Sequence, residues 1–243
     1  MSGHSKWNNI KHKKEKTDAA RAKVFTKIGK EIAIAVKEGG ADPVSNSKLR
    51  DLIAKAKANN VPNDNIDRII KKAAGDGDGA SYEVIMYEGY GPCGVAIIVD
   101  CMTDNRNRTA GDVRHYFDKY GGNMGAAGCV SWSFDKKGVI VINDEDEELD
   151  EDTVMMDALE AGADDMQHEG TIFEIYTDPD AFQEVYNALE AAGYKFVSAQ
   201  VEMVPQNYIT VTDEGDIKNL TKMLDMFEDN DDVQNVWHNW ENA

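Results

Sequence analysis

The sequence predicts an α+β protein: a helical first third, followed by two αβ units of which the later is inserted into the earlier. Three observations predict this class. Apolar residues in the first 75 positions recur every three or four residues, as in amphipathic helices. A glycine-rich stretch at 75–79 ends that pattern. Beyond it, β-branched segments alternate with helical ones. The predicted domains are 1–75, 80–134 together with 205–243, and 135–204.

The first helix is expected to start at Thr17 or Asp18 and to stop at Gly39, with a buried stripe that includes Ile28 and Ile32. Lysines recur on the opposite face of this helix. One face can therefore pack while the other presents ammonium groups. These are Lys16, Lys23, Lys27, Lys30 and Lys37. Two further helices, near 45–58 and after Pro62, complete a three-helix bundle.

The segment after the glycine-rich stretch predicts mixed αβ structure. A turn rich in glycine at 88–92 favours a hairpin between its first two strands. The expected elements are strands at 82–90 and 94–101, a helix at 109–120 capped by Thr109, and a strand at 129–134.

From residue 138 the chain alternates as β-α-β-α-β, and its two helices end on similar sequences, which indicates a ferredoxin-like sandwich. The C-terminal part adds a strand, a helix and a strand that complete the sheet begun at residue 82. The expected elements are strands at 139–142, 171–177 and 197–204 with helices at 153–161 and 180–191, then a strand at 208–211, a helix at 216–227 and a strand at 233–237.

Charge is distributed very unevenly. Residues 1–75 hold 17 of the 26 Lys and Arg but only 8 of the 45 Asp and Glu, which gives this part a net charge of +9. The rest of the chain carries −28, so the overall −19 hides a basic end that fits polyanions.

Other classes of protein fit poorly. No apolar stretch is long enough to span a bilayer, and the basic N-terminus has no secretory apolar region. Cys93, Cys101 and Cys129 match neither a CxxC redox motif nor a zinc knuckle. We therefore expect a cytoplasmic protein with no membrane partner.

The N-terminal arm is the first candidate nucleic-acid contact, because cations interleaved with an aromatic ring fit phosphate contact plus base stacking. Only Glu15 and Asp18 oppose nine Lys or Arg among the first thirty residues. The alternative is a solubilising basic tail. The candidate residues of the arm and first helix are Lys6, Trp7, Lys11, His12, Lys13, Lys14, Lys23, Lys27 and Lys30.

The second candidate is the segment 104–109, where Arg106 and Arg108 precede the helix expected from Thr109. Free N–H groups at a helix start and two guanidinium groups can bind phosphate. The alternative, equally favoured, is that both arginines pair with local carboxylates.

Catalytic and metal sites are not indicated. The glycines at 121–128 lack the ending of a phosphate-binding loop and predict a turn, and the acidic residues at 144–152 lack the spacing of an EF-hand. His115 with Asp100 and Asp104 has no metal-ligand spacing. We expect no enzyme activity and no cofactor.

Several motifs together resemble the YebC/PmpR family, which includes the mitochondrial translational activator of cytochrome c oxidase subunit one. They are GHSKW at 3–7, KIGKEIAIAVKEGGADP at 27–43, NNVP at 59–62, EGYGPCGVAIIVDCMTDNRNRT at 88–109 and GGNMG at 121–125. The resemblance implies three domains, no cofactor and a non-enzymatic regulator of gene expression. It also implies polyanion contact by Lys6, Trp7, Lys11, Lys13, Lys14, Arg106 and Arg108.

Two hypotheses for the target stay open. The family's bacterial members are usually called DNA-binding transcriptional regulators, which favours DNA. The lysine face, however, offers phosphate contacts without base readout, and the −28 of the rest of the chain would be repelled by a long duplex. A ribosome offers both rRNA and basic proteins, so a translation factor that contacts rRNA or tRNA is the alternative. A third class, a protein-interaction module with an incidental basic tail, would keep its partner without residues 1–20.

Overall fold

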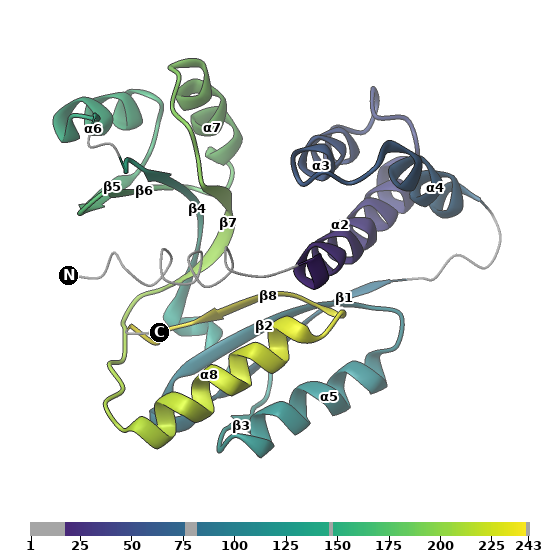
Figure 1. Ribbon diagram of the computed structural model, residues 1–243, viewed down its shortest axis with the longest axis vertical. Coiled ribbons are helices and arrows are strands. Elements are labelled where there is room, and N and C mark those ends of the chain that lie inside the picture. Colours follow the sequence, from purple (N-terminus) through teal and green to yellow (C-terminus); the bar gives the residue numbers. More distant parts are fainter. Residues whose placement is uncertain (1–17, 76–81, 146–147, 242–243) are drawn as a thin grey trace.

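The computed structural model describes residues 18–75, 82–145 and 148–241, in which a helical segment precedes two four-stranded antiparallel sheets. The predicted α+β class is therefore confirmed. Figure 1 shows the helical segment and the second sheet on the same side of the first sheet. Within these ranges no helix is both long and apolar enough to cross a membrane. The domain limits given above stay a prediction.

The helical segment consists of α2 (Asp18–Gly39), α3 (Ser47–Ala58) and α4 (Asn63–Ala74). Ile32, Leu49 and Ala56 are fully buried between them, as the apolar stripes predict. One buried amide joins two helices: the Asn46 side chain accepts from Leu49 N at 3.0 Å and donates to Ala35 O at 2.8 Å. It thereby caps α3 and ties it to α2.

The first sheet has the strand order β3-β1-β2-β8. A hairpin of β1 (Glu83–Tyr90) and β2 (Ala96–Thr103), joined through η1 (Pro92–Gly94), is flanked by β3 (Asn123–Met124) and by β8 (Val233–His238) from the C-terminal end. Two helices, α5 (Arg106–Lys119) and α8 (Glu214–Asp229), cover one face (Figure 1). Phe117 of α5 and Phe227 of α8 are fully buried there, with ring centroids 5.1 Å apart.

The second sheet has the order β5-β6-β4-β7, with α6 (Glu151–Glu160) and α7 (Phe182–Ala191) packed on its core. Its strands in chain order are β4 (Phe134–Asn143), β5 (Asp165–Glu169), β6 (Ile172–Thr177) and β7 (Ser198–Pro205). The resulting β-α-β-β-α-β sequence is the ferredoxin-like arrangement.

The clearest differences from the expected elements are three. The polar edge strand β5 was missed, because its DMQHE sequence carries little apolar signal. The strand expected at 129–134 is wrong: Val130 and Phe134 are buried on either side of a short 3₁₀ turn, η2 (Ser131–Ser133). Instead of a strand at 208–211, a single parallel bridge joins Ile209 to Trp240.

The chain enters the second sheet through β4 and leaves it through β7, and these two strands pair with each other. Residue pairing of β4 with β7 begins at Phe134 opposite Pro205. Gln206 N then donates to Ser133 O at 2.9 Å. Both crossings therefore form one hydrogen-bonded ribbon.

The glycine-rich segment at 121–128 is held in place by a carboxylate of β1. Glu88, 5% exposed, accepts hydrogen bonds from Gly128 N at 2.8 Å, Val130 N at 2.9 Å and Ser131 N at 2.8 Å. Burial alone raises the pKa of Glu88, but these backbone donors outweigh it and lower the pKa below its ordinary value. The segment is thus a fixed turn rather than a phosphate loop.

Replacement of Glu88 by alanine is expected to release this turn, because three backbone N–H groups lose their acceptor. Amide hydrogen exchange of Gly128, Val130 and Ser131 should accelerate by at least about tenfold in Glu88→Ala. Glu83→Ala, an exposed change on the same strand, is the control and should leave these amides protected. Equal protection in both variants would refute the role of Glu88.

Candidate nucleic-acid interface

Three lysines of the predicted face of α2, Lys23, Lys27 and Lys30, turn toward the first sheet, whereas Lys37 is exposed. Lys23 Nζ lies 2.6 Å from Asp229 Oδ1 at the end of α8. Lys27 is half-buried near the thiol of Cys101. Burial raises the pKa of that thiol to about 12, and the charges of Lys27 and Lys30 oppose the rise. The acidic end of α8 and the following turn thus attract this lysine face.

The prediction that Lys30 contacts nucleic acid is wrong, because its side chain is only 9% exposed and cannot present its ammonium group to a polyanion. Its Nζ donates to Asp232 Oδ1 at 2.7 Å, to Asp231 O at 2.8 Å and to Met102 O at 3.1 Å. All three ammonium protons therefore have acceptors in the protein. Lys30 joins the helical segment to the first sheet.

Asp232 receives donors from several elements at once. Its Oδ2 accepts from Arg108 Nη2 at 2.6 Å, Thr109 Oγ1 at 2.9 Å and Thr103 Oγ1 at 3.1 Å. Burial by itself raises the pKa of Asp232, but the hydrogen bonds from Lys30, Arg108 and Thr109 outweigh it and lower the pKa to about 2. The carboxylate therefore stays ionised at neutral pH. We call Asp232 and its side-chain donors the Asp232 network; the donors are Lys30, Thr103, Arg108 and Thr109.

The two candidate arginines lie inside α5 and not in a loop before it. The helix begins at Arg106, and its cap is Asn105, whose side chain accepts from Arg108 N at 3.1 Å. The prediction of Thr109 as the cap is wrong, because its hydroxyl belongs to the Asp232 network. Arg108 also pairs with Asp104 at 2.9 Å, as the carboxylate-pairing alternative expected. Arg106 is 66% exposed and lies 3.9 Å from Glu83.

The arm residues Lys6, Trp7, Lys11, His12, Lys13 and Lys14 lie outside the described residues. Further exposed cations, outside the predicted contact residues, lie on α3 and α4. Lys48 and Lys55 pair with Glu38 and Glu31 at 2.8 and 2.9 Å. Lys57, Lys71 and Lys72 are exposed and form no ion pair with any described residue. The sequence feature that could have indicated these three lysines is their position in the last turns of two predicted helices.

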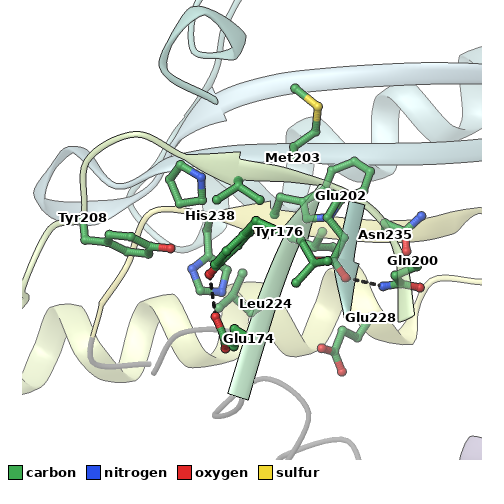
Figure 2. A pocket seen from close by; sticks show the side chains of 15 residues that line it. Glu174, Tyr176, Gln200, Glu202, Met203, Tyr208, Leu224, Glu228, Asn235 and His238 are labelled. Carbon is green, nitrogen blue, oxygen red and sulfur yellow. Dashed lines mark hydrogen bonds between the residues drawn. The ribbon is translucent and has the colours of Figure 1, made fainter. Parts of the chain in front are cut away.

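A cavity of about 70 Å³ lies between the second sheet and the α8–β8 part of the first (Figure 2). Glu174, Glu202 and Glu228 line it, and Tyr176 Oη donates to Glu174 Oε2 at 2.6 Å. None of its 15 lining residues is a lysine or arginine, so the cavity disfavours phosphate. Among the described residues no group of His, Cys, Asp and Glu has the arrangement of a metal site.

The chain is similar to known proteins over nearly its whole length. Residues 5–76 match a family model described as the TACO1/YebC protein N-terminal domain, and residues 82–240 match one described as the TACO1/YebC second and third domain. A "Probable transcriptional regulatory protein" of Acetivibrio thermocellus is 61% identical over 99% of both chains. One of Agathobacter rectalis with the same name is 58% identical over 99% of this chain and 100% of its own length. The crystal structure of a conserved hypothetical protein from Aquifex aeolicus is 43% identical, covers 93% of this chain and 92% of its own, and has a TM-score of 0.83.

Replacement of Asp232 by asparagine should lower the free energy of unfolding by about 3 kcal/mol at pH 7, since it leaves Lys30 buried without its counter-charge. The folded-state pKa of about 2 lies below the unfolded value of about 3.9, so the carboxylate stabilises the fold above pH 4 and loses this effect as the pH falls toward 2. The difference between wild type and Asp232→Asn should therefore shrink in acid, as urea unfolding at several pH values would show. Asp225→Asn, on the exposed side of α8, is the control. A difference that is constant with pH would contradict the assignment.

Proposed function

The chain belongs to the TACO1/YebC family, and from that premise we propose that it is a non-enzymatic regulator of gene expression that acts in the cytoplasm by binding nucleic acid. The observation that carries the proposal is the uneven charge, +9 on residues 1–75 against −28 on the rest. Besides the basic arm, the exposed ammonium groups of Lys57, Lys71 and Lys72 can donate hydrogen bonds to phosphate.

Duplex DNA is the first candidate target, because the curated relatives are named as transcriptional regulatory proteins. In this proposal the helical segment contacts the phosphate backbone through lysines of the arm and of α3 and α4. Lysine binds phosphate without reading sequence, so affinity would depend on salt more than on base order.

A ribosome-associated translation factor is the second candidate, favoured by the negative charge of residues 76–243. Two acidic αβ units are repelled by a long duplex but attracted to basic ribosomal proteins, while the basic arm contacts rRNA or tRNA. The two candidates differ in which particle the native protein accompanies.

Neutralising the arm tests the proposed nucleic-acid binding directly. Lys11, Lys13 and Lys14 changed together to alanine should weaken binding to a DNA duplex and reduce the slope of log affinity against log salt by about one unit for each phosphate that the arm no longer neutralises. The same number of changes at Lys136, Lys137 and Lys195, in the second αβ unit, is the matched control. Fluorescence anisotropy across a salt series measures both quantities, and an unchanged slope would exclude the arm.

Sedimentation of native lysate through a sucrose gradient separates the two candidates. A ribosome-associated factor should migrate with ribosomal particles at low salt and leave them at high salt. A DNA-binding regulator should stay at the top of the gradient at low and at high salt when the lysate has been treated with a deoxyribonuclease.

A further inference from the structure

A groove of about 220 Å³ opens between α2 and α4, beside Tyr82. Its apolar lining comes from small side chains of both helices, among them Ala33 and Ala73. At Gly29 the two helices approach so closely that a Cβ atom there would lie 3.1 Å from Ile69 Cδ1. The two helices are thus in close contact at Gly29, next to the space lined by Ala33 and Ala73.

Two aromatic rings also line this groove, those of Phe25 and Tyr82, both half-buried. Lys30 Nζ lies 5.5 Å from the centre of the Tyr82 ring. Lys30 is itself fixed by Asp232, so the Asp232 network holds Tyr82 in place through a cation–π contact. The groove thus has preformed apolar and aromatic surfaces.

Cations meet the apolar surface at the same place. Lys37 and Lys72, both exposed, line the groove from α2 and α4. No acidic residue is among its lining residues in the described part of the chain. A ligand that complements this surface has a flat apolar body with negative charge attached, a description that fits a nucleotide and not a basic or purely apolar peptide.

We propose that this groove accepts one unpaired base of a single-stranded nucleic acid, with the adjoining phosphates on Lys37 and Lys72. This inference rests on the proposed nucleic-acid binding and adds a strand preference to it. The faces of the bases in a duplex are covered by their neighbours, whereas in a single strand a base can turn out and stack on a protein surface. The protein should therefore bind single strands more tightly than duplexes of equal length.

Filling the groove tests the proposal without changing charge. Ala33→Leu and Ala73→Leu each place a larger side chain in it from opposite helices, and Ala54→Leu on the exposed side of α3 is the matched control. The probes are fluorescein-labelled oligonucleotides of about twelve nucleotides, single-stranded or duplex, whose anisotropy is followed with the full-length protein. Thermal unfolding by circular dichroism verifies that each variant is folded, and two filling variants guard against the failure of one.

Either groove-filling variant should weaken single-strand binding by about tenfold and leave duplex binding and the salt slope unchanged. Lys72→Ala should instead lower the single-strand salt slope by about 0.7, whereas Lys136→Ala, in the second αβ unit, should leave the slope unchanged. Wild-type single-strand affinity in both folded filling variants would overturn the groove while leaving the proposed function intact. An absence of salt-dependent binding by the wild type to either probe would overturn the proposed function as well.

Discussion

The buried carboxylate of Asp232 is the point on which the arrangement of the described parts depends. It accepts from Lys30 of the helical segment, 202 positions away in the sequence, and from Arg108 and Thr109 at the start of α5. Buried charges must be paired, so the helical segment cannot leave the first sheet without exposing or orphaning these groups. The ion pair of Lys30 and Asp232 thus fixes the helical segment against the first sheet.

This pairing changes how the basic character of the N-terminal part is used. Lys23 and Lys30 on α2 bind carboxylates of the same chain, Asp229 and Asp232, and neutralise the acidic end of α8. Exposed lysines outside this contact lie on α3 and α4, at Lys57, Lys71 and Lys72. A lysine face on an amphipathic helix is consequently ambiguous evidence for polyanion binding, because an acidic partner within the fold satisfies it equally well.

Local signals predicted the fold well and its contacts poorly. The helices of the N-terminal part follow from apolar spacing and from caps within a few residues. The predicted bounds of α2 and α3 and the predicted start of α4 agree with the structure to within two residues. Lys30 carries no local mark that separates it from Lys37, because its partner comes from the opposite end of the chain. Asn105 and Thr109 are both residue types that cap helices, but in the structure Asn105 accepts from Arg108 N while the Thr109 hydroxyl donates to the distant Asp232. The arm candidates remain predictions.

The ribbon that carries the second sheet has a mechanical consequence. Because β4 and β7 are paired from Phe134 and Pro205 onward, the inserted unit stands on two bonded strands instead of on two loose tethers. The two connections of the inserted unit cannot slide past each other without breaking the hydrogen bonds between β4 and β7. A displacement of the inserted unit would therefore act on both connections together and would reach the chain at Ser131, a residue whose N–H donates to Glu88.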